Sequence, residues 1–247
     1  MNSRTEPPDW LGAVWNRALT EAGATAPEAE IARLGTKLLD RWCNPARVFH
    51  GIGHLIMVLE KIDELSQEAS CPCLVRLAAF YHGAALSPGP AQLGGRAWSE
   101  DEAASAELAY SQLTHLGLPE TKAARVRALV LSLGGRSPDL RDPDAAVLGD
   151  AERAVLAADP RAYRAYAEGL RAECEGGAPI AVLEARIGVL RSWLSRGRLF
   201  STSSTAAWEE TARNNIEAEL VRALKELAAA EALDPAPEHD FAAKPGE

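Results

Sequence analysis

The chain has little cysteine, no long apolar run and no excess of positive charge, and each absence excludes a class of protein. Its 247 residues contain four cysteines, too few for a disulfide framework in a chain of this length. No apolar run reaches the roughly 18 residues that a membrane span requires. The formal net charge of −9 argues against partners such as nucleic-acid polymers or anionic membranes.

The beginning of the chain also lacks the features of a secretory signal. MNSRTEPPDW has neither a basic segment nor the apolar segment that follows it in a signal peptide. We therefore interpret the four cysteines as reduced thiols and expect a cytoplasmic location. The prominence of Ala, Arg and Leu is typical of a high-GC bacterium.

Helical periodicity dominates what is present. Apolar residues recur at three- and four-residue steps, as in Ile31, Leu34, Leu38 and Trp42, and no alternating strand of useful length is found. Further helices are expected at 73–85, 119–133, 143–158, 160–175, 179–195 and 206–233. These patterns predict an all-α fold, a single-domain helical bundle of about nine to ten helices.

The domain boundaries follow from the same pattern. Residues 1–8 are expected to form an N-terminal extension, 9–233 the helical domain, and 234–247 a disordered tail. Within the domain, Ser99 with Glu102 has the spacing of a capping box, which predicts a helix start there.

Three of the five histidines, and one aspartate, are candidates for a site. His50 and His54 lie four residues apart in RVFHGIGHLIMVLE, so they share a helix face if the helix includes residue 50. Such a pair can bind a metal or a phosphate, or simply occupy a helix surface. His82 ends the apolar segment LAAFYH, where a core histidine with a hydrogen-bond partner is the simpler interpretation. Asp150 lies near an apolar helix face, so it is paired, binds metal, or flanks that face in solvent.

Five short segments, in order, resemble segments of the HD superfamily of metal-dependent phosphohydrolases, in particular a bacterial branch of predicted HD phosphohydrolases. NPARVFHGIGHL is similar to Arg-x-Tyr-His-x-x-x-His-Leu, and LAAFYHGAALSP to apolar-Phe-Phe-His-Asp-x-x-Tyr. SEDEAASAELA is similar to Asn-Glu-x-x-Ser-Ala, and WEETARNNIEAEL to Glu-x-x-Ala-Arg-x-Asn-Leu. LGDAERAVLAADPRAYRAYAEGLRAEC resembles Leu-Asp-x-Asp-Leu-x-Ile-Leu followed by Tyr-x-x-Tyr and Ile-Arg-x-Glu-Tyr. The resemblance covers residues 10–222.

This resemblance implies a role for each matching residue. His54, His82 and Asp150 match the metal ligands. His50 matches a position that lines or supports the pocket, and in a hydrolase we expect it to act as acid or base. The positions implied to line or support a substrate pocket are Arg47, Glu102, Arg171 and Arg213. The implied cofactor is a divalent metal ion (Mn, Fe, Co, Zn or Mg), and the implied ligand is a small phosphorylated molecule or a nucleotide.

The chain departs from the family pattern at two places. Gly83 stands where the family has its namesake aspartate, and LSLGGRS places Leu133 and Arg136 where a Thr-x-x-His is usual. A glycine supplies no ligand, and an arginine adds positive charge where a cation would bind. The expectation is therefore a single ion at most, or a metal-free pocket in which Arg47 and Arg136 bind phosphate directly.

Three functions stay open on the sequence. The first is an HD phosphohydrolase-like protein with weakened or lost catalysis. The second is a non-catalytic pocket for a phosphorylated small molecule or nucleotide. The third is a helical protein-interaction module, with homo-oligomer formation among its outcomes and the C-terminal helix as its docking surface.

Overall fold

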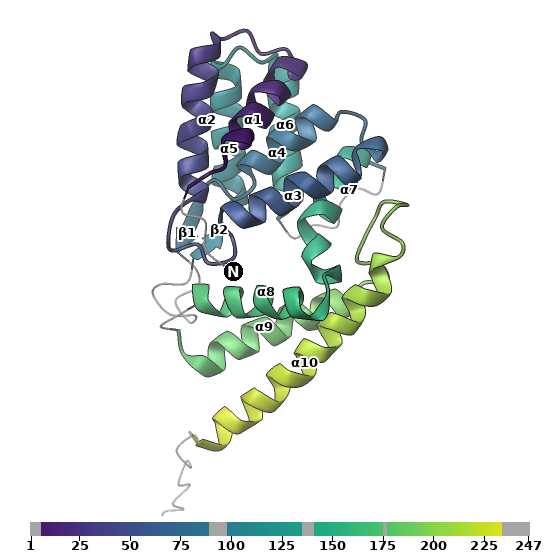
Figure 1. Ribbon diagram of the computed structural model, residues 1–247. Coiled ribbons are helices and arrows are strands. Elements are labelled where there is room, and N and C mark those ends of the chain that lie inside the picture. Colours follow the sequence, from purple (N-terminus) through teal and green to yellow (C-terminus); the bar gives the residue numbers. More distant parts are fainter. Residues whose placement is uncertain (1–5, 89–97, 135–140, 175–176, 234–247) are drawn as a thin grey trace, which may run out of the picture.

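The computed structural model describes residues 6–88, 98–134, 141–174 and 177–233, which form ten α-helices, two 3-10 helices and one short hairpin (Figure 1). The α-helices are α1 (Asp9–Ala22), α2 (Glu28–Trp42), α3 (Ile52–Glu64), α4 (Pro72–Tyr81), α5 (Glu102–His115), α6 (Glu120–Ser132), α7 (Pro143–Arg153), α8 (Pro160–Glu173), α9 (Pro179–Leu194) and α10 (Trp208–Leu233). The 3-10 helices are η1 (Ser66–Glu68) and η3 (Ala154–Ala157), and the hairpin pairs β1 (Leu86–Pro88) with β2 (Trp98–Glu100). The predicted all-α fold is confirmed.

Helices α1 to α7 form one region, which we call the N-terminal body. Its core is one continuous cluster of buried apolar side chains contributed by all seven helices. The contact of Trp15 with α2 shows how closely these helices pack. The indole N–H of Trp15 on α1 donates to the carbonyl of Ile31 on α2, 2.9 Å away, where the two helices cross. A Cβ at Gly35 would lie 2.5 Å from the Trp15 ring, so this crossing requires glycine.

Residues 154–174 and 177–233 form a second region, which we call the C-terminal layer. Figure 1 shows α8, α9 and α10 beneath the body, with α8 and α10 diverging from each other toward the C-terminal end of α10. Its core is smaller and is divided between two clusters, one of which holds only Leu183, Ile187 and Ala223 as buried members. The layer therefore has less apolar burial to hold its helices together.

Several sequence expectations need local correction. The segment around Ser99 belongs to β2, and α5 is capped instead by Asp101, whose side chain accepts from the Ala104 N–H. The helix expected over 143–158 ends at Arg153 and continues as the 3-10 turn η3. The hairpin was not expected, because its strands are only three residues long. The predicted tail and Arg136 lie outside the described residues.

Candidate functional site

His54 and His82 meet at the junction of α3 and α4. His54 lies in the first turn of α3, His82 follows the last residue of α4, and their Nε2 atoms are 3.1 Å apart. The Nδ1 atom of His82 is 2.6 Å from the Ala79 carbonyl, which can only accept, so this nitrogen carries the proton. The unprotonated Nε2 of His82 therefore faces His54. Both side chains are deeply buried, with 3% and 1% of each residue exposed.

The surroundings of the two imidazoles favour their neutral forms. Burial lowers the pKa of His54 well below its usual value, and the neighbouring His82, His50 and Arg47 lower it further. Burial also lowers the pKa of His82 to about 4, although its bond to Ala79 opposes the shift. Without a cation between the rings, His54 Nε2 must donate to His82. That tautomer leaves Nδ1 of His54 as a buried acceptor with no hydrogen-bond partner among the described residues.

The 3.1 Å between the Nε2 atoms of His54 and His82 is also close to the separation of two nitrogen ligands on one metal ion. Imidazole nitrogens bound to one tetrahedral ion at the usual bond lengths stand roughly 3.3 Å apart. Two ligands are not a complete site, since zinc and iron centres take at least three from the protein. Among the described residues, no three histidine, cysteine or acidic side chains gather as a metal-binding group.

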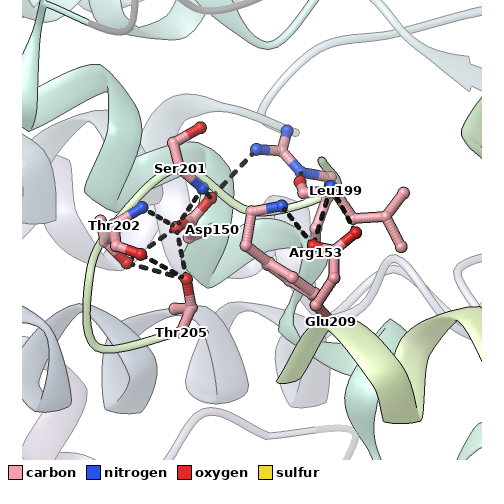
Figure 2. Close-up of polar contacts among 8 residues, drawn as sticks. Asp150, Arg153, Leu199, Ser201, Thr202, Thr205 and Glu209 are labelled. Atoms are coloured by element: carbon pink, nitrogen blue, oxygen red, sulfur yellow. Dashed lines mark hydrogen bonds and ion pairs between the residues drawn. The ribbon is translucent and has the colours of Figure 1, made fainter. Parts of the chain in front are cut away.

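Asp150, the third predicted ligand, is engaged elsewhere. It lies on α7 with no exposed surface, and its carboxylate binds the loop between α9 and α10 (Figure 2). It accepts from the N–H groups of Ser201 and Thr202, from the Thr202 and Thr205 hydroxyls, and from Arg153. Both carboxylate oxygens are occupied by these donors. Among the described residues, Asp150 does not gather with His54 and His82 as a metal-binding group.

Arg47 places a buried positive charge beside the two histidines. Its guanidinium donates to the Gly83 carbonyl over 2.6 Å and to the His50 carbonyl over 3.2 Å, and it lies over the Trp42 ring. In the resemblance to the HD superfamily expected from the sequence, Gly83 matches the position of the namesake aspartate. The chain therefore presents a cation and a backbone carbonyl where the family pattern implies a carboxylate.

His50 forms a separate pair with Glu173, the last residue of α8. The His50 Nδ1 atom lies 2.6 Å from the Glu173 carboxylate, which also accepts from the N–H groups of Phe49 and His50. Burial works to raise the pKa of Glu173, but the hydrogen bonds and charge of His50 outweigh it and the net shift is downward. An ionised Glu173 holds the proton of His50 on Nδ1 and would stabilise an imidazolium, as acid–base catalysis requires.

Sequence reasoning missed Glu173, although a signal for it was present. The residue stands in LRAEC, the string similar to Ile-Arg-x-Glu-Tyr that pointed to Arg171. The close approach of α8 to the 47–50 turn depends on Gly169, where a Cβ would lie 3.2 Å from that of Phe49. The small residue lets the end of α8 reach the beginning of α3.

A cavity of about 580 Å³ opens beside His50, between α8, α9 and α10. His50 and Arg171 both line it, so the structure brings two predicted site residues to one cavity. Arg171 pairs there with Glu226 of α10 over 2.6 Å, and both side chains are about half exposed. A volume of this size is typical of small-molecule sites.

The remaining predicted residues lie apart from this cavity. Arg213 pairs with Glu209 and donates to the carbonyls of Leu194, Arg196 and Gly197, so it holds the turn after α9. Glu102 begins α5 and lies near Gly134. Burial raises the pKa of Glu152, and the charges of Arg153, His50 and Glu102 also act on it. Asp150, two residues earlier on α7, is the carboxylate that binds the 201–205 loop.

No family model, curated protein or solved structure matches this chain. Within the described residues, no helix combines the length and apolar character needed to cross a bilayer. The site must therefore be interpreted from its own geometry.

Proposed function

We propose that this protein is an HD phosphohydrolase-like protein whose pocket binds a phosphorylated small molecule and which has lost two-metal catalysis. The observation that carries the proposal is the Arg47 guanidinium, 2.6 Å from the Gly83 carbonyl and beside the paired imidazoles. A permanent positive charge in this buried position disfavours a cation bound next to it. The ligand site in this proposal is the cavity lined by His50 and Arg171.

Two further features support binding rather than hydrolysis. A catalytic metal needs an open coordination position that substrate or water can reach, but His54 and His82 are almost completely buried. The carboxylate expected to complete the ligand set, that of Asp150, is used by the 201–205 loop. In contrast, His50 keeps 28% of its side chain exposed.

A single-metal hydrolase is the second candidate, and one observation favours it. The 3.1 Å separation of the His54 and His82 Nε2 atoms is close to that of two ligands on one ion. Such an ion would supply a Lewis acid and lower the pKa of a bound water. His50, held by Glu173, would then be the residue that moves a proton.

The two candidates are separated by metal content and turnover. The full chain should be purified without chelator, and bound Mn, Fe, Co and Zn measured by mass spectrometry alongside a His82→Ala variant. Hydrolysis of nucleotides and of p-nitrophenyl phosphate should be assayed with Mn²⁺, Co²⁺ and Mg²⁺. We expect clearly substoichiometric metal in both proteins, no turnover, and saturable calorimetric binding of phenyl phosphate. One equivalent of metal that disappears in His82→Ala, together with turnover, would establish the single-metal enzyme instead.

The Gly83→Asp variant tests whether the missing carboxylate at this position explains the loss of metal binding. The variant restores a carboxylate next to Arg47, whose charge it would neutralise. We expect metal content to rise toward one equivalent in Gly83→Asp, and no rise in Gly188→Asp, a matched change on α9 with open space around the glycine. Unchanged metal content in Gly83→Asp would contradict the role given to Gly83.

A further inference from the structure

The cavity beside His50 extends along α8. Its lining includes Arg164 near the beginning of that helix and Glu173 at its end. Nine residues of α-helix separate these two positions, which corresponds to roughly 14 Å. The cavity therefore has room for a ligand longer than a phosphate group or a simple inorganic anion.

The floor of the cavity is apolar. The side chains that form it come from all three helices and are Leu170, Val182, Leu183, Ala185, Val189 and Ala223. Val189 is exposed to 42% of its area, although it lies on a helix that packs closely against α10. Burial of such side chains under an apolar ligand is favourable.

Most charges around the cavity are already paired. Arg171 pairs with Glu226, and Arg186 pairs with Glu219 over 2.7 Å while also contacting Tyr166. These pairs leave no net charge for a ligand to neutralise.

Arg164 of α8 and Arg222 of α10 also line the cavity, and neither makes a hydrogen bond or ion pair to any other described residue. Glu168 is the one lining carboxylate in the same condition, so the unpaired groups sum to two positive charges and one negative charge. The contact of Tyr163 with Glu219 brings α8 and α10 together next to both arginines. The arginines therefore lie toward the same end of the cavity, and the His50–Glu173 pair lies at the other.

We infer that the ligand is an amphipathic organic anion, with its anionic head at Arg164 and Arg222 and an extended apolar body along the cavity floor. This inference rests on the proposed function only in assuming that the cavity takes an anionic ligand. Arginine matches the oxygens of phosphate and of carboxylate alike, so the shared chemistry is an anionic head on an aliphatic chain. The apolar floor excludes a ligand whose body is as polar as its head.

The test is a calorimetric chain-length series on the full protein. The probes are butyl, octyl and dodecyl phosphate, the carboxylates octanoate and dodecanoate, and inorganic phosphate, all below their micelle concentrations. Each buried methylene should tighten binding roughly threefold to fourfold. We expect octyl and dodecyl phosphate to bind with rising affinity and inorganic phosphate to bind weakly or not at all.

Two sets of variants locate the site. Arg164→Gln with Arg222→Gln should weaken dodecyl phosphate binding at least tenfold, because each removes a charge-assisted contact. Arg161→Gln with Lys225→Gln is the matched control, since both residues are exposed on the same helices and neither lines the cavity. Ala185→Trp should fill the cavity and abolish binding, whereas Glu184→Trp, the exposed neighbour that does not line it, should not.

The outcomes separate this inference from the proposed function. Nucleotides that bind while alkyl phosphates do not would overturn the amphipathic ligand and leave the phosphorylated-ligand proposal standing. Carboxylates that bind with rising chain length while no phosphate does would overturn the proposed function and keep the cavity assignment. An affinity independent of chain length, or equal losses in the control variants, would overturn the inference itself.

Discussion

The N-terminal body and the C-terminal layer are held together by different forces. The body has one large core in which whole helix faces are buried, with Trp15, Leu55 and Phe80 fully inaccessible. The layer has two small clusters, and its helices are joined by polar bridges such as Tyr163 to Glu219 and Arg186 to Glu219. Because apolar side chains do not fill the space between α8, α9 and α10, a cavity remains there. The difference suggests a rigid scaffold and a thinner region in which a ligand can bind.

Carboxylates that accept from main-chain N–H groups cross the boundary between the two regions, beside apolar contacts such as Phe49 against Tyr166. Asp150 and Glu68 of the body bind the 201–205 loop of the layer. Glu173 of the layer binds the N–H groups of Phe49 and His50 in the body. These bonds fix the position of His50 relative to the cavity, so changes at the boundary should affect both stability and ligand binding.

Asp150→Ala should have the largest effect on the free energy of unfolding. The change leaves the Ser201 and Thr202 N–H groups and the Arg153 guanidinium without their buried acceptor. We expect a loss of about 3–5 kcal/mol in urea unfolding, the range for breaking a buried charged network.

Asp159→Ala is the matched control for this change. Asp159 is an exposed carboxylate that also accepts from main-chain N–H groups, at the N-cap of α8, and its loss should cost about 1 kcal/mol. Equal losses in the two variants would mean that the 201–205 loop contributes little to joining the regions.

Two leucine truncations compare the regions directly. Leu55 is fully buried in the body, whereas Leu183 is 9% exposed and lines the cavity in the layer. Leu55→Ala should cost about 3–5 kcal/mol, and Leu183→Ala about 1–2 kcal/mol, because it enlarges an existing cavity instead of creating one. Equal costs in thermal or urea unfolding would contradict the contrast drawn between the two cores.

The same contrast explains what the sequence could predict. Helix positions follow from apolar periodicity, and the expected helices over 119–133, 160–175 and 179–195 match α6, α8 and α9 closely. Contacts between residues far apart in the sequence leave no such periodic pattern. Spacing leaves open whether Asp150 is paired, binds metal or flanks its apolar face in solvent. It does not show that Ser201 and Thr202 bind Asp150 from a loop about 50 residues later. The meeting of His54 with His82 was suggested by the family resemblance rather than by periodicity.

Tyr163→Phe should have a smaller effect, confined to the layer. The phenol donates to the Glu219 carboxylate over 2.5 Å, and burial is the main reason that its pKa is raised. Its removal should cost about 1–2 kcal/mol, since Glu219 keeps its ion pair with Arg186. Hydrogen exchange should quicken in α8 and α10 and stay unchanged in α1 to α4. Faster exchange throughout the body would show that the two regions unfold as one unit.

Acid should weaken the bonds from Glu68 to the 201–205 loop, and this is the smallest effect expected. Partial burial works to raise the pKa of Glu68, but hydrogen bonds from Ser203 and Ser204 outweigh it and lower the pKa from 4.5 to about 2. A carboxylate with a depressed pKa stabilises the fold above its unfolded value, and that contribution is lost as the pH falls toward about 2. Glu68→Gln should therefore melt slightly below the wild type near pH 7, and the difference should shrink as the pH falls below about 4.5. Melting curves of both proteins across this range measure the gap. A gap that stays constant would mean that the Glu68 charge does not help to hold the 201–205 loop against η1.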